Sequence, residues 1–318
     1  MLKVVIVGYG EMFINLIAGA LDAKCEIVGV LRGDRKKYSP LIRRIRDSII
    51  PSQDYAYIRS YKLPEIKARS VNSEAFKKAL LKLNPDVVLV GSWSEKIKKE
   101  IFSIPRLGFI NAHPSLLPLF RGSNPYYQVI KHGEDLSGIS LHLMDENFDT
   151  GAILFQRGVE VLPDDTGESL KKRTVLIARG AVFELLNKLQ DDVIIPLTQS
   201  EERATKFTSK DMEVMLDFQK TAQEVYNHVR AIHPWGQTYF AIGKEFLSPN
   251  PHKTYILDNN TSFTKAGQLV EIEPKQKVLT IVCGDNKLIR FEDITLYKKK
   301  WFTKGFLKKL AKNYSNGK

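Results

Sequence analysis

The sequence predicts an α/β protein with a mostly parallel sheet in its N-terminal part and a smaller β-barrel in its C-terminal part. Over residues 1–190, short apolar runs typical of strands alternate with stretches whose apolar residues recur at helical spacing. Several of the strand runs are apolar at nearly every position, as in parallel strands covered by helices on both faces. From residue 238 onward, only short strand-like pieces separated by Gly, Pro and Asn follow, which is typical of a small antiparallel barrel or sandwich.

The N-terminal elements follow from local signals. The run from Leu2 to Gly8 is β-branched and ends in glycine, and Asn72 and Ser73 can cap a helix that stops at Asn84. The predicted strands are 2–8, 26–31, 86–90, 108–112, 139–144 and 153–155. The predicted helices are 12–21, 73–83 and 167–189. Alternation of this kind indicates a Rossmann-like sheet.

The rest of the chain divides into a linker, a second domain and a tail. Residues 191–210 are polar and contain Pro196, which indicates a linker after a first domain of residues 1–190. An OB-like β-barrel domain is predicted over 211–297, with a helix at 221–232. Its strands are expected at 238–242, 254–257, 269–272, 278–283 and 288–294. Residues 298–318 form a basic tail.

The composition narrows the class of protein. No stretch reaches the roughly 18 apolar residues that a membrane helix needs, and no signal peptide pattern is visible, so we expect a cytoplasmic protein with no membrane partner. The two cysteines, Cys25 and Cys283, have no His or Cys nearby at metal-ligand spacing, so we expect no metal site. The net charge of +12 and the pI of about 9.4 favour a polyanionic partner.

The positive charge is concentrated in two segments. The stretch from Arg32 to Arg46 carries seven basic residues. The tail from Lys298 to Lys318 carries eight lysines and no acid, interleaved with aromatic residues such as Trp301. Either segment alone is equally well explained as a solvated face. Together they favour contact with the phosphates and unpaired bases of a nucleic acid.

A pair of glycines follows the first predicted strand. Gly8 and Gly10 stand where glycines allow a phosphate to approach the N-terminus of a helix. The third glycine of the dinucleotide-binding pattern is absent, since Phe13 occupies its position. We therefore interpret the pair as a tight turn in a Rossmann-like sheet.

Two polar segments at strand ends are the candidate site. Asn111 and His113 stand two residues apart at the end of a predicted strand, so both side chains point to one side, toward the edge where open α/β sheets bind ligands. Asp149 follows the next predicted strand, 139–144, and can lie on the same rim. Taken alone, Asp149-Thr150-Gly151 is simply a good turn.

Together the two segments resemble the folate-dependent formyltransferase family, in which an Asn-x-His-Pro-Ser-Leu-Leu-Pro loop precedes an Asp-x-x-x-Asp-x-Gly segment. The resemblance implies an enzyme with the formyltransferase fold and with 10-formyltetrahydrofolate as the formyl donor. By motif position, the catalytic residues are Asn111, His113 and Asp149. The folate contacts implied in the same way are Ser115, Leu116, Leu117 and Pro118.

These residue types suit transfer of a formyl group to an amine. Attack of the amine places negative charge on the formyl oxygen, and the amide of Asn111 or a protonated His113 can donate hydrogen bonds to it. The amine must also lose a proton, which a neutral His113 can accept. Asp149 can fix the tautomer of His113 and raise its basicity. The sequence leaves both roles of His113 open.

The acceptor is narrowed by length and by a second motif. The family serves the methionine of initiator tRNA, amino sugars linked to nucleotides, and glycinamide ribonucleotide. Enzymes for the last are single domains of about 200 residues, the scale of one sheet, so the additional C-terminal part argues against that acceptor. The segment from Val229 to Gly236 resembles one that opens the C-terminal domain in both the tRNA and the sugar enzymes, without the proline that usually precedes the glycine.

Charge favours methionyl-tRNA among the acceptors that remain, with the stretch from Arg32 to Arg46 and the tail as its contacts. The usual Gly-Arg-Gly-Lys-Lys pattern of the tRNA enzymes is absent, and Arg35-Lys36-Lys37 is its nearest equivalent. A nucleotide-linked amino sugar is the alternative, because one or two arginines suffice to hold a diphosphate. A non-catalytic RNA-binding relative is disfavoured, since the three catalytic positions are intact.

Overall fold

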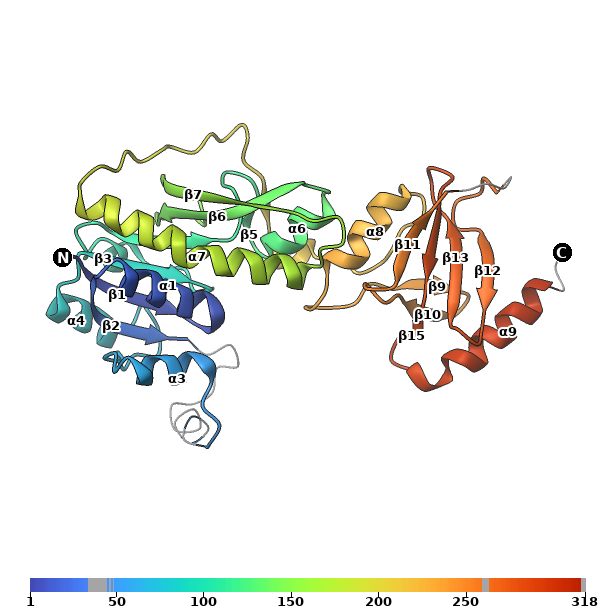
Figure 1. The fold of residues 1–318 in the computed structure, drawn as a ribbon, viewed down its shortest axis with the longest axis horizontal. Helices are drawn as coiled ribbons and strands as arrows, with labels where there is room; N and C mark the ends of the chain where they lie inside the picture. Colours follow the sequence, from blue (N-terminus) through green and yellow to red (C-terminus); the bar gives the residue numbers. More distant parts are fainter. Residues whose placement is uncertain (34–44, 46, 48, 259–262, 316–318) are drawn as a thin grey trace. The chain divides into compact units, whose positions relative to one another are not determined.

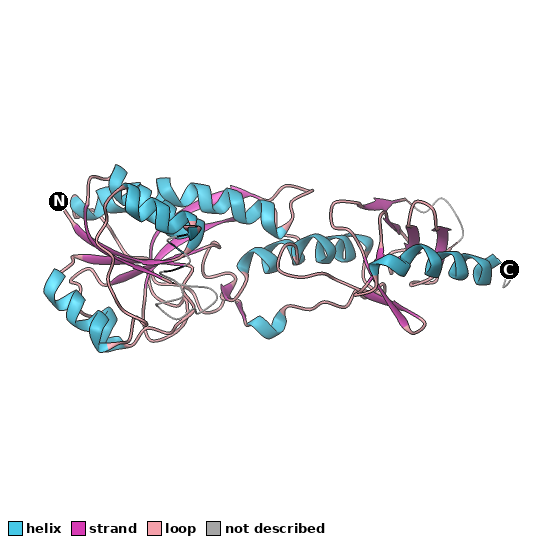
Figure 2. Cartoon of the chain, turned by 90° about the horizontal axis from the view of Figure 1, so that it is seen from below, coloured by secondary structure: helices cyan, strands magenta, loops and turns pink. Residues whose placement is uncertain are grey.

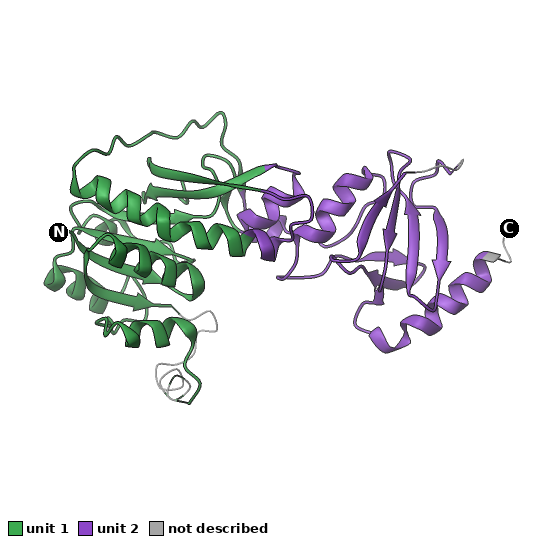
Figure 3. Cartoon of the chain, in the orientation of Figure 1, with its two compact units in different colours: residues 1–123, 136–160, 171–206 green, residues 124–135, 161–170, 207–318 purple. Residues whose placement is uncertain are grey.

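The computed structural model describes residues 1–33, 45, 47, 49–258 and 263–315. The chain packs as two units, and neither unit is continuous in sequence (Figure 3). The first unit comprises residues 1–123, 136–160 and 171–206, and the second comprises 124–135, 161–170 and 207–318. The division into domains at residues 190, 210 and 297 remains a prediction.

The first unit contains, within the described residues, a six-stranded sheet with the order β2-β1-β3-β4-β6-β7 (Figure 1). Its strands are β1 (Lys3–Gly8), β2 (Glu26–Arg32), β3 (Val87–Gly91), β4 (Phe109–His113), β6 (Leu136–Leu143) and β7 (Ile153–Glu160). The first four run parallel, whereas β6 is antiparallel to both β4 and β7. The predicted mostly parallel sheet is therefore confirmed.

Both faces of the central strands are buried, as their apolar sequences predict. In β1, Val4 and Ile6 belong to one hydrophobic core, and Val5 and Val7 belong to the other. The first core is completed by α1 (Gly10–Asp22) and α7 (Gly167–Gln190), and the second by α4 (Glu74–Leu83) and α5 (Lys99–Phe102). Figure 2 shows helices on both sides of this sheet. A strand that is covered by helices on both faces of the sheet must be apolar at successive positions.

Local signals place the helix boundaries correctly. The Ser73 hydroxyl accepts a hydrogen bond from the Phe76 backbone amide, 3.3 Å away, and so caps α4. Asn84 ends that helix in the left-handed conformation, with φ of 45°. β7 extends beyond the predicted 153–155 to Glu160. The prediction was too short because the second half of the strand alternates partly buried and exposed residues and so lacks the apolar run of the other strands. Another helix of this unit is α3 (Gln53–Ser60).

The second unit combines helices with antiparallel strands. α6 (Pro125–Lys131) and α8 (Ala222–Ala231) are its first helices. Within the described residues, one sheet has the order β15-β10-β9 and another has the order β11-β14-β13-β12. Their strands are β9 (Phe240–Ile242), β10 (Glu245–Ser248), β11 (Thr254–Leu257), β12 (Leu269–Glu273), β13 (Val278–Val282), β14 (Leu288–Phe291) and β15 (Thr295–Leu296). The predicted antiparallel character is confirmed, although β10 was not among the predicted strands.

The basic tail contains a helix that is part of the second unit's core. α9 (Thr303–Ser315) buries Leu307 completely and packs the partly buried Phe306 and Leu310 against the same core. Lys304, Lys308, Lys309 and Lys312 remain exposed. The helix is thus amphipathic, with an apolar face that packs on the strands and a lysine-rich face toward solvent.

Most of the predicted basic stretch from Arg32 to Arg46 lies outside the described residues. Arg32 itself is described, and it is buried rather than available to a polyanion. Its guanidinium forms ion pairs with Asp47, with Asp54 at 3.7 Å and with Glu65 at 3.5 Å. The expectation that Arg32 contacts RNA is therefore wrong, because three carboxylates already surround its charge.

Candidate active site

Two neighbouring antiparallel strands bring four polar side chains to one face of the sheet. In the register of β4 and β6, Asn111 lies opposite His142, and His113 lies opposite Ser140. The alternate residues of both strands, such as Ala112 and Leu141, point into the first hydrophobic core. The period of two along each strand therefore separates the polar site from the core.

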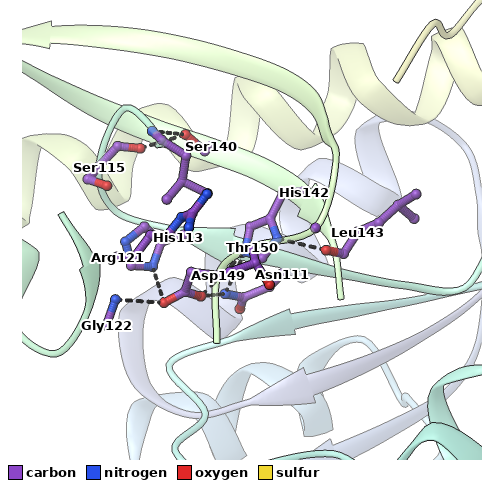
Figure 4. Close-up of polar contacts among 12 residues, drawn as sticks. Asn111, His113, Ser115, Arg121, Gly122, Ser140, His142, Leu143, Asp149 and Thr150 are labelled. Atoms are coloured by element: carbon purple, nitrogen blue, oxygen red, sulfur yellow. Dashed lines mark hydrogen bonds and ion pairs between the residues drawn. The ribbon is translucent and has the colours of Figure 1, made fainter. Parts of the chain in front are cut away.

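Asp149 occupies the centre of this group (Figure 4). Its Oδ1 accepts a hydrogen bond from Asn111 Nδ2 at 3.2 Å, and its Oδ2 accepts one from the backbone amide of Gly122 at 2.9 Å. His113 Nδ1 lies 3.4 Å from Oδ2, and His142 Nε2 lies 3.4 Å from Oδ1. The structure thus brings together all three predicted catalytic residues.

The environment of Asp149 keeps its carboxylate charged. Burial alone would raise the pKa of Asp149, but the positive charge that His113 and His142 carry when protonated, together with the Gly122 amide, outweighs it and holds this pKa well below its ordinary value. Burial acts the other way on His113, where it lowers the pKa despite the opposing attraction of Asp149. A neutral imidazole beside a carboxylate anion is the arrangement expected of a base before it accepts a proton.

The tautomer of His113 follows from its second contact. Nε2 lies 2.9 Å from the carbonyl oxygen of Phe120, which can only accept, so Nε2 carries the hydrogen. In the neutral ring, Nδ1 then holds the lone pair and faces Asp149. A proton accepted at Nδ1 would lie beside the carboxylate, which stabilises the resulting imidazolium.

Ser140 and Gln156 hold the loop that follows β4. The Ser140 hydroxyl donates to the carbonyl oxygen of Ser115 at 2.6 Å and accepts from the Leu117 amide at 3.0 Å. Gln156 Nε2 donates to the Ser140 hydroxyl at 2.8 Å and to the Leu117 carbonyl at 3.0 Å. The Ser115 hydroxyl donates to the carbonyl oxygen of Leu119 at 2.7 Å. These hydrogen bonds hold the loop in place, both against β6 and β7 and through its own Ser115 hydroxyl.

The four predicted folate contacts differ in exposure. Ser115 and Leu117 are buried, and the Ser115 hydroxyl donates within the loop. Leu116 and Pro118 are only partly buried and retain surface for a ligand. Contact of any of the four with folate remains a prediction.

The turn that carries Asp149 is held by a residue from the predicted linker, Gln199. Asp149 adopts a left-handed conformation, with φ of 59°. Gln199 Nε2 donates to the carbonyl oxygens of Asp149 at 2.9 Å and of Gly151 at 2.7 Å. The buried Arg121 guanidinium donates in turn to Gln199 Oε1, at 3.0 Å from Nε. A Cβ at Gly151 would come within 1.9 Å of the Leu143 carbonyl oxygen, so this position requires glycine.

Several residues of the site were not predicted. His142 and Ser140 lie two residues apart on a predicted strand, as Asn111 and His113 do, so period-two spacing was a usable signal for them. Gln156 lies just beyond the predicted limits of its strand, and Gln199 lies in a segment interpreted as a linker. No local pattern distinguishes these two glutamines from others in the chain.

The described residues contain neither a metal-binding group nor a membrane-spanning helix. No group of three or more His, Cys, Asp or Glu side chains among them is arranged to hold a metal ion. None of their helices combines the length and the apolar character that crossing a membrane requires.

Comparisons with known proteins match most of the chain to one family. The family model described as "Formyl transferase" matches residues 2–184, and the model described as "Formyl transferase, C-terminal domain" matches residues 209–310. A protein of Thermotoga maritima named methionyl-tRNA formyltransferase is 30% identical over 231 residues, 72% of each chain. A protein of Kosmotoga olearia with the same name is 26% identical over 294 residues, 92% of each chain.

Solved structures share the fold at lower identity. The N-formyltransferase of Helicobacter canadensis, in complex with folinic acid and dTDP-3-aminofucose, has a TM-score of 0.68 at 18% identity and covers 93% of this chain and 100% of its own. A sugar 3N-formyl transferase solved with dTDP and 5-N-formyl-THF has a TM-score of 0.67 at 20% identity, with coverage of 92% and 97%. Both units of the chain thus have counterparts of known fold.

Proposed function

The chain belongs to the formyl transferase family, and from that premise we propose that it transfers a formyl group from 10-formyltetrahydrofolate to the amino group of methionyl-tRNA. The observation that carries the reaction class is the convergence of Asn111, His113 and a charged Asp149 on one face of the sheet. Two kinds of residue are needed, a base for the amine and donors for the formyl oxygen, and the group contains both.

The donor supplies a formyl carbon that is activated toward attack. As the amine nitrogen forms its bond to that carbon, His113 Nδ1 accepts a proton from the nitrogen, and Asp149 stabilises the imidazolium at 3.4 Å. Asn111 provides amide hydrogens for the oxygen that gains charge. The bond from the formyl carbon to the folate nitrogen then breaks, and the proton that His113 accepted is available to that leaving nitrogen.

Two observations support methionyl-tRNA as the acceptor. Relatives that cover 72% and 92% of the chain carry that name. In addition, α9 presents exposed lysines beside Trp301 and Phe302, whose side chains are 97% and 70% exposed. Lysines neutralise phosphates, and exposed aromatic rings stack on unpaired bases, so this surface has the chemistry that an RNA ligand needs.

A nucleotide-linked amino sugar is the second candidate acceptor. The Helicobacter canadensis enzyme, whose structure contains dTDP-3-aminofucose, shares the fold over 93% of this chain. We favour tRNA because a sugar nucleotide has no use for an exposed basic helix with neighbouring aromatic rings.

The deciding experiment supplies the purified chain with 10-formyltetrahydrofolate and either methionyl-tRNA or a panel of nucleotide-linked amino sugars. Formyl-methionyl-tRNA is the product expected. Formylation of a sugar nucleotide without formylation of methionyl-tRNA would replace the first candidate with the second. If the chain formylates neither acceptor but still hydrolyses 10-formyltetrahydrofolate, both proposed acceptors would be rejected. Formyl transfer from the folate donor would then remain as the reaction class.

A further inference from the structure

The side chain of His142 makes polar contacts that the proposed reaction does not use. His142 is buried on β6, directly opposite Asn111 on β4. Its Nδ1 lies 2.8 Å from the carbonyl oxygen of Leu143, and its Nε2 lies 3.2 Å from Asn111 Nδ2 and 3.4 Å from Asp149 Oδ1 (Figure 4).

The tautomer of the neutral ring follows from these contacts. A carbonyl oxygen can only accept, so Nδ1 carries the hydrogen that bonds to Leu143. Nε2 is then left with a lone pair, which makes it an acceptor. Among the described residues in contact with Nε2, only Asn111, through its amide nitrogen, can donate to it.

The orientation of the Asn111 amide follows in turn. Its nitrogen has two hydrogens, and two acceptors lie at 3.2 Å, namely His142 Nε2 and Asp149 Oδ1. A reversed amide would place its oxygen against a lone pair and a carboxylate. No donor among the described residues bonds to the Asn111 oxygen, so this orientation depends on His142 and Asp149 together.

We propose that His142 is a positioning residue that fixes the amide of Asn111 and holds the hydrogen that Asn111 donates to the formyl oxygen during transfer. Both amide hydrogens are engaged before a reactant binds, so one must be released. Hydrogen bonds to a charged carboxylate are stronger than those to a neutral ring. The hydrogen that His142 holds is therefore the one that is released. This assignment rests on the proposed formyl transfer.

Kinetics of matched variants test the proposal. His142→Leu removes the acceptor, and we expect kcat to fall about tenfold with KM changed by less than about threefold. His142→Gln keeps an acceptor at the end of its side chain and should restore kcat to within about threefold of the parent. His252→Leu, on an exposed turn outside the site, is the control for loss of a histidine.

A double-mutant cycle separates positioning from a general structural effect. If His142 acts through Asn111, His142→Leu should change kcat by less than about twofold when Asn111→Ala is already present. Equal losses in both backgrounds would overturn the proposal.

Nitrogen NMR of the chain labelled with 15N-histidine tests the same idea without any substrate. We expect the His142 signal, identified by its loss in His142→Gln, to report hydrogen on Nδ1 and a bare Nε2. A hydrogen on Nε2 with a bare Nδ1 would overturn the proposal even if formyl transfer is confirmed. The expected tautomer in a chain that formylates no amine would instead reject the proposed function and leave the hydrogen-bond arrangement intact.

Discussion

Gln199 donates a hydrogen bond of 2.9 Å to the backbone carbonyl oxygen of Asp149, the central residue of the candidate site. The same amide nitrogen also donates to Gly151, and Gln199 Oε1 accepts from Arg121. Gln199 therefore connects three parts of the chain: the predicted linker, the turn that carries Asp149, and the end of the loop that follows β4, where Arg121 lies. Both polar atoms of its side chain have hydrogen-bond partners, so substitutions there have definite consequences.

Gln199→Met keeps the length of the side chain but removes its hydrogen bonds. We expect the free energy of unfolding to fall by about 1–3 kcal/mol, because buried carbonyls and the Arg121 guanidinium lose partners. We also expect kcat to fall, since the Asp149 turn is less well fixed. Chemical denaturation and steady-state kinetics measure the two effects. Gln276→Met, at an exposed position of the β12–β13 turn, is the control and should change neither.

Asn111→Ala, His113→Ala and Asp149→Ala should each lower kcat at least about a hundredfold, the scale expected for loss of a proton-transfer or oxyanion group. Circular dichroism should show that each variant is folded. Near-normal turnover in the His113 variant would contradict the mechanism.

The pH dependence of activity should reflect the lowered pKa of His113. Burial disfavours the imidazolium, so the ring stays neutral, and able to accept a proton, to a pH below its ordinary pKa of 6.5. As pH falls through the lowered pKa, His113 becomes protonated and the base is lost. The acidic limb of kcat/KM should therefore lie below pH 6.5. A limb above that value would show that the ring is not desolvated in the free enzyme.

The lysine-rich face of α9 should control affinity for tRNA. Replacing Lys304, Lys308 and Lys312 with Gln should weaken binding and reduce the slope of log affinity against log salt by about 0.7–0.9 for each phosphate that is no longer neutralised. Trp301→Ala should weaken binding by about 1–3 kcal/mol with little change in that slope, because stacking releases no counterions. Removal of the whole tail is a poorer test, since the buried Leu307 belongs to the core. The test is a set of binding titrations at several salt concentrations. If the parent and the lysine variant show the same slope of log affinity against log salt, an RNA role for α9 is contradicted.

Gly151→Ala should destabilise the first unit strongly. The added Cβ would overlap the Leu143 carbonyl oxygen at 1.9 Å, and backbone must move to accommodate it. We expect a loss of more than about 2 kcal/mol in unfolding free energy. Gly305→Ala is the matched control, since apart from its chain neighbours and the nearby backbone of α9 no atom lies within 4 Å of its Cβ position. Helix propensity predicts that this control gains up to about 1 kcal/mol.

The fold was predictable from sequence where burial leaves a regular pattern. The strands β1 and β3 are apolar throughout because both faces are covered, and Ser73 caps α4 through its own hydroxyl. β10 was not predicted because only two of its four residues, Phe246 and Leu247, are apolar, so it shows no strand-like run. Among site residues, Asn111, His113 and Asp149 belong to recognisable motifs. The role of Gln199 depends on interactions between segments distant in sequence, and no local pattern encodes them.

The buried faces of β1 also bear on how this protein can change over time. Substitutions on either face must preserve packing, so few changes in the central strands can alter which amine the enzyme accepts. Variation in the accepted amine is then confined to strand ends, loops and the second unit. A library for a new acceptor should leave the sheet untouched and diversify those positions, and lineages that adopted different amines are expected to differ in the same places.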